Sequence, residues 1–433
     1  MGINMAGTLN MAIANKKASA SMLKGLFIWS LATIFYFFDN LLNVAPAAIQ
    51  AQLTLEFSLN AAKLGILMSC YAWPYALMQI PVGILMDKYG PRRLLTLACL
   101  SCTIGTLIFA NANIFATACL GRLFIGFGAS FAVVGCAKIS TIWFSSDKFA
   151  TFMGIMVAVG MFGAAAGLSS VRELFTLFGW RFTMSIAAVF SLFLSALLWI
   201  SIVDNKPNTK TKDNQQQTSK LMDGLKIIMS NSQSWYTVIY AGLMFVPTMA
   251  FGALWGVPFM EKSFGFSEHS AGILNSMIFY GWIVGGPLWG WFSDYIKKRN
   301  LPMLWTNFAT LLLTISVIYG KHLGMPISFT SLATQMFLIG FFSSGFVVAF
   351  AVVKELNPAK IAGTAVGFTN TINTLSIAIF QWLIGSIIDY VQVGSEPVAA
   401  DFEKALIAVP ICLIISILVI LLVKETNCTS MES

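Results

Sequence analysis

A chain of 433 residues carries 26 Lys and Arg and 18 Asp and Glu, so only 10% of it is charged while 57% is hydrophobic. Soluble domains are about one quarter charged, so this composition excludes a soluble enzyme, a secreted disulfide scaffold and a disordered chain. The net charge of +8 does not indicate nucleic-acid binding, because the basic residues are scattered among short loops. The sequence therefore predicts an integral membrane protein.

Apolar runs of about 20 residues, long enough to cross a bilayer, recur along the chain. We expect twelve spans, at 24–46, 61–86, 94–112, 116–142, 149–171, 182–203, 234–259, 270–292, 302–320, 328–352, 362–389 and 404–423. The longest polar stretch separates the sixth span from the seventh and is rich in Asn, Gln, Lys and Thr. The sequence thus predicts an N-terminal six-helix bundle at 1–203, a cytoplasmic linker at 204–231 and a C-terminal six-helix bundle at 232–433.

The distribution of Lys and Arg among the loops predicts the orientation. With both termini cytoplasmic, the inside segments hold 18 basic residues and the outside segments six, while Arg122 and Lys138 fall within a span. We therefore expect a multi-pass protein of the bacterial cell inner membrane with both termini in the cytoplasm. We expect no cofactor and no metal, because Cys99 and Cys102 lie in an apolar helix without nearby His or carboxylate.

An internal repeat links the two halves. Gly83, Asp87 and Arg92 in the loop after the second span recur as Gly290, Asp294 and Arg299 after the eighth, at a constant offset of 207 residues. A second repeated motif is Thr151-x-x-Gly154 in the fifth span, which recurs as Thr364-x-x-Gly367 in the eleventh. Two six-helix halves related in this way are typical of a transporter built from parallel repeats.

The run Gly-x-x-x-Asp-Lys-x-Gly-x-Arg-Arg at 83–93 resembles the cytoplasmic loop signature of the major facilitator superfamily. Arg122-x-x-x-Gly126-x-Gly128 and the glycines of the fifth span are similar to further patterns of that family, although its usual Gly-Pro pair is missing. Within the family, the chain resembles bacterial metabolite transporters and the branch that contains a lysosomal dipeptide uniporter. The resemblance covers the whole chain. It implies an all-α integral membrane fold of twelve transmembrane helices in two six-helix bundles.

The same resemblance implies an inner gate, in which the aspartate pairs across the gate with a basic residue and the glycines allow close approach of helices. Its residues would be Gly83, Asp87, Gly90, Arg92 and Arg93 of the first copy, and Gly290, Asp294 and Arg299 of the second. Lys297 replaces Gly90, and Asn300 replaces Arg93, so we expect the second copy to be weaker.

A polar stripe marks the first span. Tyr36, Asp39, Asn40 and Asn43 are spaced i, i+3, i+4 and i+7, which places them on one helix face. An ionisable group within a span is costly and is therefore a candidate functional group. We expect Asp39 to serve as a substrate-amine or proton site; the alternative is a structural polar cluster near the outer surface.

Arg122 and Lys138 share the fourth span, where their separation of 16 residues corresponds to about 24 Å of rise. Either could supply positive charge for an anionic substrate. The alternatives are an ion pair of Arg122 with Asp39 and snorkelling of Lys138 to the inner interface. In the second half, the candidate substrate or coupling contacts are neutral, and half of them could be helix–helix contacts instead. They are Tyr236, Tyr240, Asn370, Asn373 and Gln381.

Helix-breaking residues concentrate in the seventh span. Pro247 lies there with Gly242, Gly252 and Gly256, so we expect this span to bend as the outer gate closes.

We therefore predict a secondary active transporter, not an enzyme, that moves a small polar, anionic or zwitterionic metabolite by alternating access. An amino acid, a short peptide or a carboxylate would fit, with proton-coupled symport through Asp39. The expected partners are a small-molecule substrate, protons and the lipid bilayer, with no nucleic acid, and the protein is expected to be a monomer. The alternatives are a facilitative uniporter, an exporter of a small organic anion such as a carboxylate siderophore, and a transporter-like membrane sensor.

Overall fold

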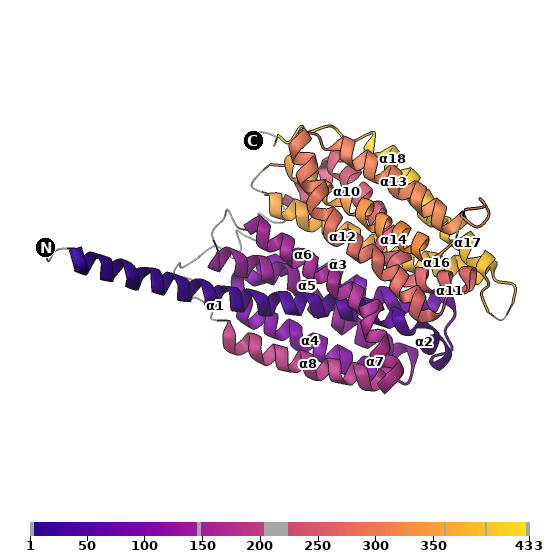
Figure 1. Cartoon of the computed structure of the whole chain (residues 1–433), viewed down its shortest axis with the longest axis horizontal. Helices are drawn as coiled ribbons and strands as arrows, with labels where there is room; N and C mark the ends of the chain where they lie inside the picture. Colours follow the sequence, from indigo (N-terminus) through magenta and orange to yellow (C-terminus); the bar gives the residue numbers. More distant parts are fainter. Residues whose placement is uncertain are drawn as a thin grey trace.

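The computed structural model describes residues 4–144, 149–202, 224–325, 327–358, 361–394 and 396–429. Side chains are described from Met22 onward, except at positions 80, 84, 87, 141, 149–151, 362 and 363. All regular secondary structure within these ranges is helical (Figure 1).

Six spans make up the first half of the chain, because long apolar runs satisfy their backbone hydrogen bonds internally as helices. The first span is broken into α1 (Asn4–Val44), η1 (Ala45–Ile49) and α2 (Gln50–Glu56). The other helices of this half are α3 (Ala61–Tyr89), α4 (Pro91–Ala110), α5 (Phe115–Trp143), α6 (Phe149–Leu168), α7 (Ser170–Phe178) and α8 (Trp180–Ser201).

The second half repeats this layout. Its seventh span consists of α10 (Ser232–Val246), a π-helical segment η3 (Pro247–Trp255) and α11 (Gly256–Phe264). The remaining elements are α12 (Glu268–Ile296), α13 (Asn300–Tyr319), α14 (Phe329–Ser343), η4 (Ser344–Val347), α15 (Val348–Glu355), α16 (Ala362–Val391), α17 (Ala399–Leu406) and α18 (Ala408–Ile420).

The predicted fold class is confirmed. Eleven helical stretches of the described residues are long and apolar enough to cross a membrane, and α3, with 29 residues, is the twelfth long helix. Figure 1 shows the first half as one bundle and the second half as another beside it. Most of the predicted linker, 204–223, lies outside the described residues, whereas residues 224–230 are helical and Ile228 packs against Val353 and Phe368 of the second half.

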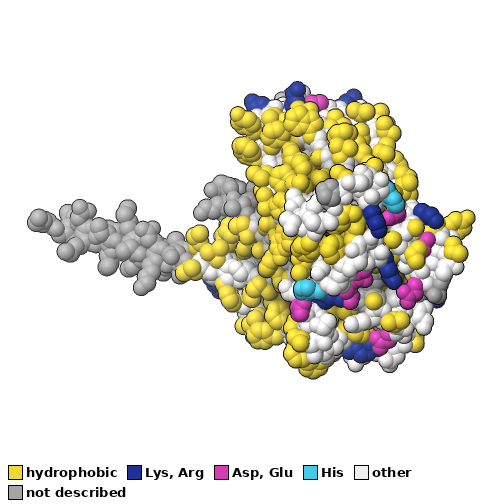
Figure 2. Space-filling view, turned by 45° about the vertical axis from the view of Figure 1, so that its right-hand side comes forward, with side chains coloured by type: hydrophobic (Ala, Val, Ile, Leu, Met, Phe, Trp, Pro, Cys, Tyr) yellow, Lys and Arg dark blue, Asp and Glu magenta, His cyan; other side chains and the backbone are white. Residues whose placement is uncertain are grey.

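The surface of the bundles fits a bilayer. Large apolar side chains such as Phe182, Phe193, Trp291 and Leu418 are more than half exposed. Figure 2 shows hydrophobic side chains over much of the visible side, with charged side chains gathered on the end that comes forward. Contiguous apolar surface of this kind is covered by lipid in a membrane protein.

Two seams join the halves. α3 packs along α16, and α6 packs along α12. Both chain ends lie at one end of the molecule, which we call the termini face, while α2, α7, α11 and α17 lie at the opposite face (Figure 1). The seams run from one face to the other, so they determine whether the space between the halves opens at either end.

Candidate functional site

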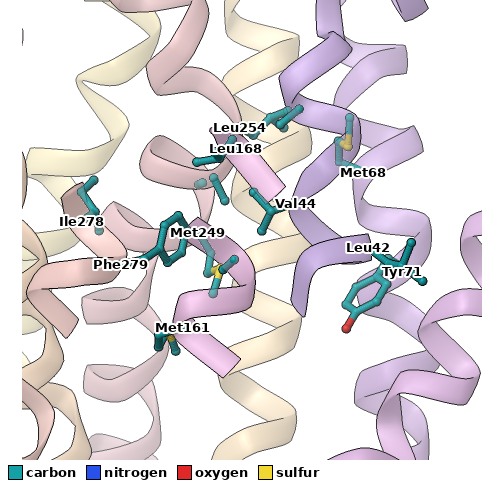
Figure 3. Close-up of a cluster of buried hydrophobic side chains, with 14 of the residues drawn as sticks. Leu42, Val44, Met68, Tyr71, Met161, Leu168, Met249, Leu254, Ile278 and Phe279 are labelled. Atoms are coloured by element: carbon teal, nitrogen blue, oxygen red, sulfur yellow. The ribbon is translucent and has the colours of Figure 1, made fainter. Parts of the chain in front are cut away.

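A polar cavity of about 100 Å³ lies between the two halves. Helices α1, α3 and α6 contribute one wall, and α10, η3 and α16 contribute the other. The lining residues are Tyr36, Asp39, Asn40, Asn43, Met68, Tyr71, Ala72, Tyr75, Met161, Phe245, Met249, Asn370, Thr374, Ile377 and Gln381. Apolar side chains of both halves, including Val44 and Leu168 of the first and Leu254 and Ile278 of the second, gather beside it (Figure 3).

Asp39 is the buried carboxyl group of this cavity. Its side chain is 2% exposed, and its Oδ1 accepts a hydrogen bond of 2.6 Å from the Tyr71 hydroxyl. No ion pair to Asp39 is found in the part of the chain that the structure describes. The other three residues of the polar stripe, Tyr36, Asn40 and Asn43, line the cavity with it.

Tyrosines from α3 complete this wall. The rings of Tyr71 and Tyr75 stack with their centroids 5.8 Å apart, and the Tyr75 hydroxyl interacts with Gln79 and, across the cavity, with Asn370. These tyrosines were not among the site residues predicted from the sequence. Their i, i+4 spacing indicates a shared helix face, but the facing residue on α1 depends on helix register, which one sequence does not reveal.

Arg122 is buried behind this wall rather than in it. Its Nη1 donates to the carbonyl oxygen of Leu42 at 2.8 Å, and its Nη2 donates to that of Asn43 at 3.0 Å. These carbonyls belong to the last turn of α1, where the helix gives way to η1 and leaves them without helical partners. The guanidinium also lies 5.1 Å from the centre of the Tyr71 ring. Arg122 therefore fixes the break in the first span.

The wall from α16 supplies neutral hydrogen-bonding groups. Asn370, Thr374 and Gln381 line the cavity, and the Gln381 amide donates to the carbonyl oxygen of Met249 at 3.0 Å. Met249 lies in η3, whose π-helical turns begin at Pro247, a residue without an N–H group. Gln381 thus ties α16 to the irregular part of the seventh span, which is the span that the sequence predicts to bend.

The other predicted contacts lie away from the cavity. Tyr240 is fully buried inside the second bundle and Asn373 is 1% exposed, and neither side chain has a hydrogen-bond partner among the described residues. Tyr236 packs against the apolar core, and Lys138 is half-buried on α5 and does not line the cavity. A helical period places a residue on a face, but it does not say which neighbour that face meets.

The first copy of the predicted gate forms the turn between α3 and α4. Gly90 ends α3 with φ 78° and ψ 158°, and Pro91 begins α4. The Arg92 guanidinium donates to the carbonyl oxygen of Trp199 at 2.8 Å and lies over the Trp199 ring, while Arg93 is exposed. Gly83 has open space beside it, and the predicted Asp87 side chain lies outside those that the structure describes.

The second copy forms an ionic cluster around the buried Arg299 side chain, within the second half. Arg299 pairs with Asp294 at 2.7 Å and with Glu355 at 2.7 Å, and Gly290 precedes this loop on α12. Burial opposes the charged form, but the hydrogen bonds to Glu355 and Asp294 raise the pKa of the Arg299 guanidinium above its usual range. The acidic partner Glu355 was not among the predicted gate residues.

The opposite face is held closed by contacts between the halves. The Asp389 carboxylate on α16 accepts hydrogen bonds from the backbone N–H groups of Ala61, at 2.8 Å, and Ala62, at 2.7 Å, at the start of α3. On the other seam, Arg172 of α7 forms an ion pair with Glu268 of α12. We call these contacts the two latches.

His269 adds a further contact beside the second latch, because its Nδ1 lies 2.6 Å from Glu173.

The glycines of the two seams are packed differently at the two faces. At the opposite face, a Cβ at Gly65 would lie 2.6 Å from the carbonyl oxygen of Gln381, so the two backbones touch. Nearer the termini face, a Cβ at Gly83, Gly154, Gly290 or Gly367 would meet nothing within 4 Å. These are the glycines of the two repeated sequence motifs, and they lie on the four seam helices. The seams are therefore packed at the opposite face and open toward the termini face.

The family model described as "Major Facilitator Superfamily" matches residues 28–380 and 243–428. The chain belongs to the major facilitator superfamily. The resemblance seen in the sequence is confirmed, and the family consists of membrane transporters of small molecules rather than enzymes.

Relatives of known name include the probable galactarate/D-glucarate transporter GarP of Escherichia coli K12, 24% identical over 405 residues that cover 84% of this chain and 89% of the relative. The lysosomal dipeptide transporter MFSD1 of Mus musculus is 25% identical over 380 residues, which cover 82% of this chain and 77% of the relative.

Solved structures share the fold. A bacterial homolog of the human lysosomal transporter Spinster, inward-facing and unoccupied, gives a TM-score of 0.71 at 16% identity, covering 92% of this chain and 97% of that one. The nucleoside transporter NupG gives a TM-score of 0.73 at 15% identity, covering 92% and 99%.

Proposed function

We propose that this protein is a secondary transporter that moves a small polar metabolite across the bacterial inner membrane by alternating access, coupled to protons through Asp39. The observation that carries the proposal is the buried cavity between the halves, where the described lining residues include one carboxyl group, that of Asp39, together with amides and hydroxyls. A carboxyl group held inside a membrane transporter can take up and release a proton as the cavity changes its exposure.

The termini face would be cytoplasmic under the positive-inside rule. The packed latches and the open seam glycines then correspond to a conformation that is closed to the outside and loosened toward the cytoplasm. Closing the seams around Gly83 and Gly154 would complete the cycle. The two sets of contacts at opposite ends support rocking of one half against the other about the cavity.

The relatives suggest the range of substrates to test. Sugar diacids are named for GarP, and dipeptides are named for MFSD1. An amino acid, a short peptide and a carboxylate therefore form the starting panel for uptake into proteoliposomes, with and without an imposed pH gradient.

The expected result is accumulation of at least one solute that depends on the pH gradient, and its loss in Asp39→Asn. Glu396→Gln is the matched control, because Glu396 is an exposed carboxylate paired with Lys262 far from the cavity. Accumulation by Asp39→Asn at the wild-type level would exclude Asp39 as the proton carrier. Uptake that equilibrates without any gradient would favour a uniporter, and tight binding without uptake would favour a sensor.

A further inference from the structure

The cavity has an unusual balance of charge. Among the described residues that line it, Asp39 is the one acidic residue and none is Lys or Arg. The titratable or charged groups that act on Asp39 are Tyr36 on its own helix, Tyr71 and Tyr75 on α3, Cys102 on α4 and Arg122 on α5. From the second half, α16, η3 and α10 present only amide, hydroxyl, thioether and apolar groups to the cavity.

Arg122 is not available to a substrate. Two of its nitrogens donate to the carbonyl oxygens of Leu42 and Asn43, and its guanidinium lies over the ring of Tyr71, whose hydroxyl donates to Asp39. Releasing Arg122 to bind a substrate carboxylate would leave those buried carbonyls without donors, which is costly. The described lining residues therefore offer no cation to an anionic substrate.

One oxygen of Asp39 is available. Tyr71 occupies Oδ1, while Oδ2 accepts no hydrogen bond from any residue that the structure describes. Four aromatic side chains, Tyr36, Tyr71, Tyr75 and Phe245, line the same cavity as this oxygen. Aromatic faces attract ammonium groups, and a carboxylate gives such a group its strongest hydrogen-bond acceptor.

We propose that the substrate carries an ammonium group that pairs with Asp39, and that this ammonium replaces the proton bound there. This inference rests on the proposed transport function. The step is Asp39–COOH plus R–NH₃⁺ giving Asp39–COO⁻ paired with R–NH₃⁺, plus one released H⁺. The protonated carboxyl group and the carboxylate–ammonium pair each leave no unpaired charge buried at Asp39. The site therefore holds either the proton or the ammonium group, but not both. Proton and substrate therefore compete, and coupling is an exchange rather than the symport predicted from the sequence.

A solute with only carboxylates fits this site poorly. A sugar diacid would bring two negative charges beside Asp39 with no basic side chain among the described lining residues to offset them. Like charges in a buried site disfavour each other. The cavity should thus bind amine-bearing solutes, such as free amino acids and peptides, in preference to the diacids named for GarP.

Calorimetric binding to the purified full-length protein tests this inference. The probes are matched pairs: L-alanyl-L-alanine against its N-acetyl form, L-alanine against L-lactate, and galactarate and D-glucarate as diacids. Titrations in two buffers of different ionisation enthalpy count the protons released. We expect binding of an amine-bearing member with release of up to one proton, and affinity that falls by up to tenfold per pH unit of acidification.

Two variants keep the test independent of folding. Asp39→Asn should weaken amine binding at least tenfold and abolish proton release, whereas Asp39→Glu keeps a carboxyl group and should retain release. Glu396→Gln should match the wild type, because its carboxylate lies away from the cavity.

Equal or tighter binding of an N-acetylated or diacid member would overturn the ammonium site, and amine binding without proton release would overturn the exchange. Absence of binding by every amine would also overturn it. Uptake into proteoliposomes distinguishes failure of this inference from failure of the proposed transport function. Uptake of diacids in preference to amines contradicts the ammonium site while leaving transport intact, whereas no uptake of any solute contradicts the proposed function itself.

Discussion

Gly90 and Lys297 occupy equivalent positions in the repeat, 207 residues apart, and both have positive φ. Gly90 combines φ 78° with ψ 158°, a region that is essentially restricted to glycine, whereas Lys297 has φ 53° and ψ 37°, the left-handed helical region. The replacement that looks like a lost glycine in the sequence therefore keeps the turn. It does so at the cost of some strain at Lys297.

These two positions predict opposite effects on stability. Gly90→Ala should destabilise the protein by about 1–3 kcal/mol, because a Cβ is strained at that φ and ψ. Lys297→Gly should stabilise it by about 1 kcal/mol, because glycine adopts the left-handed region without that penalty. Thermal unfolding of the purified variants measures both.

The matched control is Lys298→Gly, since Lys298 is exposed like Lys297 but is not among the residues with positive φ. A gain in Lys298→Gly equal to that in Lys297→Gly would show that the loss of charge, not of strain, is responsible.

At the residue scale, the sequence predicted part of the cavity and missed part of it. The stripe from Tyr36 to Asn43 could be predicted because all four residues share one helix and one period. Tyr71 and the role of Arg122 could not, because the contact of Tyr71 with Asp39 joins two helices and the Arg122 bonds go to backbone carbonyls. Contacts between helices depend on register and rotation, which a hydrophobic pattern leaves open.

At the scale of elements, the twelve spans could be predicted because each apolar run has a length set by the bilayer. The interruptions within spans were harder to predict. The sequence predicted a bend at Pro247, where η3 begins, whereas the break between α6 and α7 at Ser169 carries no proline. Such breaks are decided by the neighbouring helices that satisfy the freed backbone groups, as Gln381 does for Met249.

The C-terminal tail binds the termini face of the second half. The Glu425 carboxylate accepts hydrogen bonds from the backbone N–H groups of Arg299, at 2.8 Å, and Asn300, at 2.9 Å, and so caps the start of α13. An acidic group at a helix N-terminus is stabilised by the unpaired N–H groups there. Thr426 donates to Glu355, the partner of Arg299.

Cys428 reports whether this tail is docked. Burial, together with the carboxylates of Glu355, Asp294 and Glu425, raises the pKa of the Cys428 thiol against the opposing effect of Arg299. A raised pKa means less thiolate at neutral pH and slow alkylation. Glu425→Gln weakens the cap, so we expect the tail to undock, the pKa to return toward its ordinary value and alkylation at pH 7.5 to become several-fold faster.

Mass spectrometry of the C-terminal peptide after a timed reaction with iodoacetamide measures this rate. Glu396→Gln serves as the control, because Glu396 lies in the second half and far from the tail. An unchanged rate in Glu425→Gln would mean that the cap does not hold the tail.

At the scale of the whole molecule, the two halves are joined by contacts of different strength at the two faces. The latches at the opposite face combine a carboxylate that accepts from two N–H groups with a partly buried ion pair, in which the Arg172 side chain is 7% exposed and that of Glu268 35%. Toward the termini face, the seam glycines have open space. The latches therefore bias the molecule toward this conformation, and their removal should shift its population.

The double variant Asp389→Asn with Arg172→Gln tests this bias. Charge-assisted contacts of this kind, lost together, should change the equilibrium between conformations by about 1–3 kcal/mol, or roughly 5- to 150-fold. Leu55 and Val398 are both exposed, so spin labels at these positions can report the distance between the halves at the opposite face. Double electron–electron resonance spectroscopy measures this distance. We expect this distance to lengthen in the variant.

A second pair at Tyr89 and Tyr295 measures the termini face, where the distance should shorten as the seams close around the glycines. The labels require a background in which the seven free cysteines are replaced. Glu396→Gln removes an ion pair with Lys262 that joins two parts of the same half, so it should leave both distances unchanged. If the opposite face lengthened while the termini face stayed open, the halves would separate rather than rock, and the latches would be structural contacts instead of half of a gate.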